Sequence, residues 1–309
     1  MHRGIVRKWL LLGALLWSMA LPSWASHWVV SLPAVAHWVR PMLLPEDTLT
    51  VLLPPGQSPH HWALKPSQIR ALAEADHIVL VAPALESPLY RWARAHQRPL
   101  LVWSALEGVK LLYGEGHHHD SEAEHGDAHG VDGDAPAEKD ALHLNPHLWL
   151  SPQNGRALVR AVAAVQQTLH PQQRQAVQAR EQAALAQLTQ LDEQADAALK
   201  PLRDVPYMVL HDAFAYFDET YRLNKVGVIE PPASGIGLKR LLAMRERLQQ
   251  ANVRCVLYPA HKNPRLLRQL VRGLPVRTQA VDVLGWQHNA LDDWFSSIVK
   301  GYVQCLSPS

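Results

Sequence analysis

Residues 172–200 read QQRQAVQAREQAALAQLTQLDEQADAALK, a stretch without Pro or Gly in which Ala, Leu, Gln and Glu dominate. These residue types favour helix, so the stretch predicts one continuous helix about 43 Å long. Pro171 stands just before it and is expected to end an earlier helix that begins near Ser151. A helix this long is a candidate strut between two separate lobes.

Short apolar runs alternate with amphipathic helices on both sides of this strut, and this alternation predicts parallel sheets covered on both faces. Strands are expected at residues 28–31, 49–53, 77–81 and 100–103, and again at 207–210, 225–229, 253–258 and 276–281. Helices are expected at residues 35–43, 67–75 and 85–96, at 213–221, 238–250 and 264–271, and from Leu291 onward. The predicted fold is therefore α/β, with two lobes, each a mainly parallel sheet flanked by helices, joined by one long backbone helix.

The sequence divides into four segments, of which the first is an amino-terminal signal. The first 25 residues carry basic side chains, then a short apolar run, then small residues up to Ala25. This order is typical of a secretory signal cleaved near Ala25, because the apolar run is shorter than the roughly 20 residues of a membrane span. An uncleaved anchor is the alternative. The mature chain is predicted to comprise a first lobe at 26–150, a helical connector at 151–204 and a second lobe at 205–309.

An acidic, histidine-rich insertion interrupts the first lobe at residues 114–140. It holds nine acidic residues and five histidines, and almost nothing apolar. Such a segment cannot bury enough surface to offset its ordering entropy, so a disordered loop is expected. Its histidines are His117, His118, His119, His125 and His129.

Composition narrows the possible functions. The net charge of +2 gives no reason to expect a nucleic-acid partner, and the usual signatures of zinc proteases, serine hydrolases and P-loop nucleotidases are absent. Eighteen histidines are a marked excess, and histidine is the commonest metal-ligating side chain.

Cys255 and Cys305 are the only cysteines; in an exported chain such a pair is more often a disulfide than two buried thiols.

Ligands in open α/β sheets bind beyond the carboxyl ends of the strands. His60 follows the run at 49–53, His211 follows the run at 207–210, and Asp282 follows the run at 276–281. His147 lies in a Pro-bounded turn ahead of the strut. Three imidazoles and a carboxylate from distant parts of the chain can thus converge between the lobes, although any one such histidine alone is usually only a hydrogen-bonding loop residue.

Three motifs carry a family resemblance. PHHWALKPS at residues 59–67, NPHLWLSP at 145–152 and HDAFAYF at 211–217 resemble, in order, the metal-ligand motifs of the zinc- and manganese-binding periplasmic proteins that serve ABC importers. The match is nearest to the zinc-specific ZnuA branch and spans essentially the whole mature chain. The resemblance implies two α/β lobes joined by a rigid helix, and a disulfide between Cys255 and Cys305.

By the same resemblance, His60, His147 and His211 are metal ligands, Zn²⁺ is the transported ligand, and the partner is the membrane permease of a zinc ABC transporter. The protein is then a periplasmic binding protein, not an enzyme, and is expected to be a monomer. The histidine-rich loop is expected to be a low-affinity zinc collector or sensor, or else a solvated spacer.

The chain departs from the family pattern at two positions. His61 stands where an acidic residue is usual. Asp282, in VDVLG at 281–285, resembles the fourth carboxylate position, but water or another side chain can fill that position in zinc proteins.

Three imidazoles with at most one carboxylate favour zinc over manganese. The alternatives are a manganese-binding importer component, a metal-dependent adhesin and, less favoured, a zinc hydrolase with Asp212 or Asp282 as its general base.

Overall fold

The computed structural model describes residues 25–60, 62–114, 144–229 and 237–308. The proposed signal segment before Ala25, His61 and the five histidines of the acidic insertion lie outside the described residues. Within the described part of the chain, no helix is long and apolar enough to cross a membrane.

The first lobe is a four-stranded parallel sheet with strand order β2-β1-β3-β4. Its strands are β1 (His27–Val30), β2 (Thr48–Val51), β3 (His77–Leu80) and β4 (Leu100–Val102). Its helices are α1 (Pro33–Val39), α2 (Pro66–Glu74) and α3 (Ser87–Ala95). Because successive side chains alternate between the faces of a strand, Val29 packs with α2 and α3 while Trp28 and Val30 face the opposite core.

The second lobe repeats this arrangement, with strand order β6-β5-β7-β8 and all neighbours parallel. Its strands are β5 (Tyr207–Val209), β6 (Lys225–Val228), β7 (Cys255–Pro259) and β8 (Arg277–Val281). Its helices are α7 (Ala215–Tyr221), α8 (Leu238–Gln250), α9 (Arg265–Val271) and α10 (Leu291–Leu306). Leu248 of α8 and Leu267 of α9 pack on Met208 and Val256 on one face, as the alternation of the strands requires.

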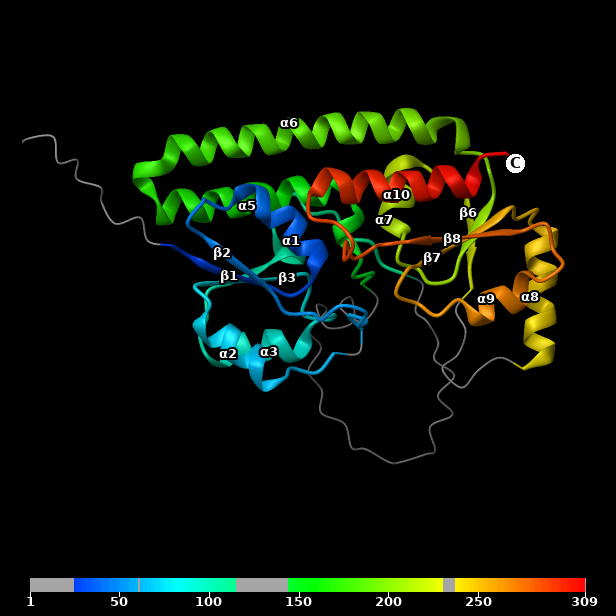
Figure 1. Cartoon of the computed structure of the whole chain (residues 1–309), viewed down its shortest axis with the longest axis horizontal. Coiled ribbons are helices and arrows are strands. Elements are labelled where there is room, and N and C mark those ends of the chain that lie inside the picture. The colour runs from blue at the N-terminus through cyan, green and yellow to red at the C-terminus, as the bar shows by residue number, and fades with distance from the viewer. Residues whose placement is uncertain (1–24, 61, 115–143, 230–236, 309) are drawn as a thin grey trace, which may run out of the picture.

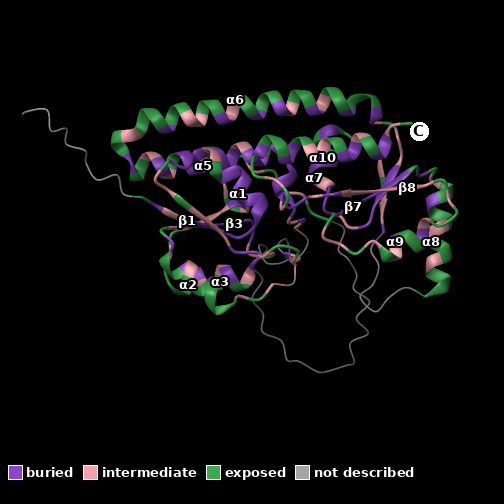
Figure 2. Cartoon of the chain, viewed as in Figure 1, coloured by how far each residue is buried: buried purple, intermediate pink, exposed green. Residues whose placement is uncertain are grey.

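Two helices connect the lobes. Helix α5 (Pro152–Leu169) begins at Ser151, whose side chain accepts a hydrogen bond from the Asn154 N–H, and ends before Pro171. Helix α6 (Arg174–Leu199) then runs above both sheets (Figure 1) and contacts α5 and α10. Its outer side is exposed (Figure 2), while a single stripe of apolar side chains is buried. The predicted long helix and the two-lobed parallel fold are confirmed.

A core of tryptophans crosses the junction between the lobes. Trp38, Trp103, Trp149 and Trp294 are fully buried and belong to one apolar cluster with residues of both sheets. The Trp38 indole donates to the Trp149 carbonyl at 3.1 Å, and the Trp149 indole donates to the Val283 carbonyl at 2.8 Å. The lobes therefore share one hydrophobic core instead of meeting at a polar hinge.

A disulfide joins Cys255 of β7 to Cys305 of α10, with their Cα atoms 5.6 Å apart. It ties the closing helix to a central strand of the second lobe, and the expected pairing is confirmed.

Candidate metal centre

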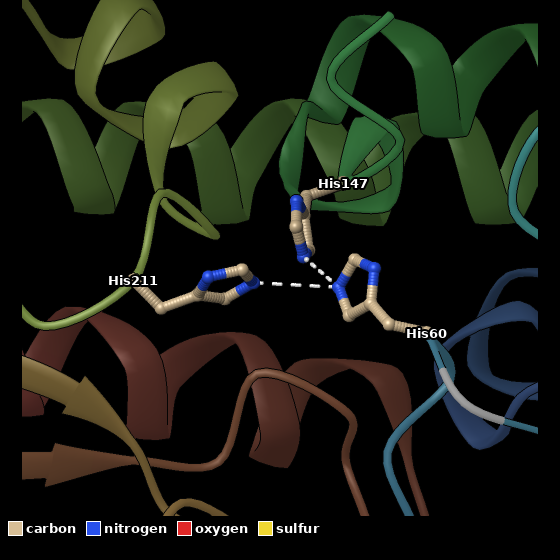
Figure 3. A group of neighbouring side chains, drawn as sticks. All are labelled: His60, His147 and His211. Carbon is tan, nitrogen blue, oxygen red and sulfur yellow. Dashed lines mark hydrogen bonds between the residues drawn. The ribbon is translucent and has the colours of Figure 1, made fainter. Parts of the chain in front are cut away.

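Three histidines from separate parts of the chain meet between the lobes (Figure 3). His60 lies in the loop after β2, and His211 lies two residues past the end of β5. His147 immediately precedes the short 3-10 helix Leu148–Leu150 that leads into α5. The first lobe, the second lobe and the segment that enters the connector thus each contribute one imidazole.

The ring nitrogens are spaced as metal ligands are. Nε2 of His60 lies 3.2 Å from Nε2 of His147 and 3.3 Å from Nε2 of His211, and one nitrogen of each ring lies within 4.8 Å of the others. A tetrahedral zinc with Zn–N bonds of about 2.0–2.1 Å places its ligand nitrogens about 3.3–3.4 Å apart. The three rings can therefore bind one such ion with small adjustments.

Burial keeps His147, one of the three histidines, uncharged. His147 is 4% exposed, and its pKa lies well below the usual value because burial disfavours the imidazolium and because His211 and His60 are close. Neutral imidazole is the form that binds a metal. The site is thus prepared for a cation without first losing a proton from His147.

His147 is held by the side chain of Asn145. The Asn145 Oδ1 atom lies 2.8 Å from Nδ1 of His147 and also accepts the His147 backbone N–H at 3.1 Å. This contact uses Nδ1 and leaves Nε2 directed at the other two rings, as Figure 3 shows.

Asp282 is not brought into this group. Its Oδ1 accepts from the N–H groups of Leu284 and Gly285, at 3.2 and 2.9 Å, and its Oδ2 accepts from the N–H of Gln287 at 3.0 Å. The carboxylate thus closes its own turn after β8. Among the described residues, the group able to hold a metal consists of the three histidines alone.

His261 is a further histidine near the site, and no sequence motif singles it out. It lies two residues past β7, beside the end of β8, where the Ala260 N–H donates to the Val281 carbonyl at 2.8 Å. Within the described structure its buried Nε2 has no hydrogen-bond partner. Burial, followed by the charges of Lys262 and His211, lowers the His261 pKa to about 4. The strand-end rule that selected His211 also applies to β7 and could have found it.

Comparisons with known proteins agree with this geometry. Residues 29–302 match the family described as ZnuA, zinc-uptake complex component A, periplasmic. A Yersinia pestis protein named high-affinity zinc uptake system protein ZnuA is 30% identical over 270 residues, 83% of each chain. A protein of the same name from Paracoccus denitrificans is 30% identical over 96% of each chain. A crystal structure of ZnuA superimposes with a TM-score of 0.75, 21% identity, and coverage of 92% of this chain and 100% of that one.

Proposed function

This chain belongs to the ZnuA family of periplasmic zinc-uptake components, and on that premise we propose that it captures Zn²⁺ with His60, His147 and His211 for delivery to a membrane permease. The observation that carries the proposal is the pair of 3.2 and 3.3 Å distances between ring nitrogens, which fit a tetrahedral ion. The three ligands come from segments far apart in the chain, so the complete site exists only in the folded protein.

The donor set favours zinc over manganese. Imidazole suits zinc, whereas manganese prefers carboxylate and water ligands. The Asp282 carboxylate is occupied by three backbone N–H groups of its own turn, which supports a site of three histidines with water in the fourth position. An ion held by three protein ligands keeps one position through which an incoming ligand can attack it during release.

A zinc hydrolase is the rival function, because three histidines and a water also describe a catalytic zinc site. A hydrolase needs a general base that reaches the metal-bound water. The Asp282 carboxylate accepts hydrogen bonds from the N–H groups of its own turn, and the Asp212 carboxylate accepts hydrogen bonds from Asn145 and Lys225. Both carboxylates are thus engaged by other groups of the protein, and the family is one of uptake components, so transport is the better-supported function.

The decisive experiment is a competitive zinc titration of the mature protein. We expect one tight site, which persists when residues 116–140 are deleted and disappears when His60, His147 and His211 are changed to alanine. A matched control changes His27, His96 and His288, which lie outside the cluster, to alanine. Tight binding that survives the first triple substitution would show that the ligands lie elsewhere.

The pH dependence offers a second test. Protons compete with zinc for the imidazole nitrogens, so affinity should fall as the pH drops from 7.5 to 5.5. The lowered pKa of His147 means that this ring resists protonation to a lower pH than an ordinary histidine. An affinity that stays constant over this range would contradict ligation by histidine.

We further propose that the protein acts as a monomer in the periplasm, after export by its amino-terminal signal, and that the acidic histidine-rich loop collects zinc weakly. Deletion of residues 116–140 should then remove only weak binding from the titration. Loss of the tight site on deletion would contradict this division of roles.

A further inference from the structure

A chain of polar contacts runs from His147 into the second lobe. It begins at Asn145, whose Nδ2 donates to the backbone carbonyl of Asp212 at 3.0 Å and to Oδ2 of its carboxylate at 3.1 Å. Both partners can only accept hydrogen bonds, so the amide nitrogen of Asn145 must face Asp212. Its oxygen must then face His147, and the proton of the imidazole must be on Nδ1.

The series of contacts continues through a half-buried lysine. Lys225 Nζ lies 2.5 Å from Oδ1 of Asp212 and 3.4 Å from Oδ2 of Asp218. Burial acts to lower the Lys225 pKa, but Asp218 and Asp212 outweigh it and raise the pKa, so this lysine is charged. The hydroxyls of Tyr207 and Tyr302 donate to the remaining Asp218 oxygen.

These contacts connect two proposed zinc ligands, His147 and His211, that come from distant parts of the chain. Asn145 is two residues from His147, and Asp212 is adjacent to His211. Tyr216 strengthens the same junction, because its hydroxyl donates to the Asn145 carbonyl at 2.9 Å. The positions of His147 and His211 are therefore fixed relative to each other by hydrogen bonds of the protein itself.

We propose that Asn145 and Lys225 are positioning residues of the zinc site: Lys225 holds Asp212, Asp212 fixes the orientation of the Asn145 amide, and Asn145 keeps the His147 proton on Nδ1. Nε2 is then left with a lone pair for the metal. The inference rests on the proposed function of the three histidines as zinc ligands.

The role of Lys225 follows from what its loss would permit. Without the ammonium group, the half-buried Asp212 carboxylate loses its counter-charge and turns toward water. The Asn145 amide is then held only by the Asp212 backbone carbonyl and the His147 N–H groups, so its preference for the present orientation is weakened. A flipped amide would present its nitrogen to Nδ1 of His147, which must then accept and carry its proton on Nε2. That tautomer cannot bind the metal through Nε2. Partners of this kind typically change metal affinity about 10–100-fold.

The test compares Lys225→Met, Lys225→Arg and Asn145→Ala with the unaltered full chain. We expect zinc to bind about 10–100-fold more weakly to Lys225→Met and Asn145→Ala, and close to normally to Lys225→Arg, which restores the charge. In zinc-free protein labelled with ¹⁵N-histidine, NMR should show the His147 proton on Nδ1 in the unaltered chain and a shift toward Nε2 in Lys225→Met.

A matched control is Lys110→Met. Lys110, like Lys225, pairs with an acidic residue, Glu219 at 2.5 Å, but this pair joins the two lobes and both of its side chains are about half exposed. Its loss should leave both zinc affinity and the His147 tautomer unchanged. Circular dichroism and thermal unfolding establish that each variant is folded. If Lys225→Met does not fold, Asn145→Ala carries the affinity test alone.

Normal zinc affinity and an unchanged tautomer in folded Lys225→Met would overturn the inference. So would weaker binding with the tautomer unchanged and no rescue by arginine, since that pattern indicates general damage. The failure of the proposed function is distinguishable, because it requires the triple histidine variant to retain tight zinc binding, whatever Lys225→Met does.

Discussion

The two lobes have the same sheet and use its carboxyl edge differently. Both order their strands with the second outermost, then the first, third and fourth. In the first lobe, Ser31 after β1 and Glu86 after β3 are buried, and Glu86 accepts the N–H groups of Val81 and Ala82 at 2.9 Å. In the second lobe, His211 and His261 follow the corresponding strands, β5 and β7.

The difference shows that strand order alone does not determine where a binding site forms. It only brings the carboxyl ends of the strands to one edge of the sheet. In the first lobe, Glu86 behind the central strand β3 satisfies backbone donors, and the ligand, His60, comes from the loop after the edge strand β2. The second lobe places His211 after the central strand β5, and the next residue, Asp212, pairs with Lys225. Its edge therefore carries the charges, while the edge of the first lobe is mainly structural.

The largest expected effect concerns the disulfide, which lies in the second lobe. Changing Cys255 and Cys305 to alanine should lower the free energy of unfolding by about 4 kcal/mol, because the bond closes a loop with a sequence separation of 50 residues. Urea unfolding measures the loss. Hydrogen exchange should accelerate more in β7 and α10 than in β1 and β3. Equal acceleration of hydrogen exchange in both lobes would show that the disulfide does not stabilise the second lobe more than the first.

The second prediction concerns Glu86 in the first lobe. Burial raises its pKa to about 7, against the opposing hydrogen bonds from the Ala82 and Val81 N–H groups. The folded state thus keeps a proton that the unfolded state loses above about pH 4.5, so this group makes the protein less stable as the pH rises toward 7. Glu86→Gln removes the effect, and its stability relative to the unaltered chain should improve by about 3 kcal/mol across that range.

Urea unfolding of zinc-free protein at a series of pH values measures this difference. A difference between Glu86→Gln and the unaltered chain that is constant with pH would show that Glu86 is ionised in the folded state.

The third effect is expected at His261, and it has the opposite sign. It should be smaller than that of Glu86 because the His261 side chain is only half-buried and water screens its charge. Its pKa is lowered to about 4, so below about pH 6.5 the unfolded state binds a proton that the folded state does not. Stability is therefore lost as the pH falls from about 6.5 toward 4. His261→Gln should diminish this loss without removing it, because His147 also has a lowered pKa. The free energy of unfolding of the zinc-free proteins should be measured against pH. If His261→Gln and the unaltered protein lost stability in parallel as the pH fell, His261 would not have a lowered pKa.

Much of the fold could be predicted because it depends on local pattern. Leu238–Gln250 agrees with the predicted helix, and the long helix was predicted at 172–200 and is observed at Arg174–Leu199. The absence of Pro and Gly and the strength of the helix formers determine both. Strand ends were harder: β7 begins at Cys255, two residues later than predicted, because its pairing with β5 and β8 decides where it starts.

The site was less accessible to sequence reasoning. The three histidines could be selected because each stands in a recognisable motif, and the structure brings them together. The contacts of Asn145 with Asp212, and of Asp212 with Lys225, depend on how the lobes meet, which no local pattern encodes. The turn that occupies Asp282 depends on backbone N–H directions, which the residue types alone do not specify.

The shared tryptophan core also governs how the chain acquires its structure. His37 of α1 bonds the Gly285 carbonyl 248 positions away, and Trp294 of α10 packs on Trp38. Folding rates fall as contacting residues become more distant in sequence, so assembly of this core should be slow. Until residues 291–306 arrive, Trp38 has no cover from α10, and a nascent first lobe exposes apolar surface. We therefore expect the partly folded chain to aggregate more readily than the folded protein.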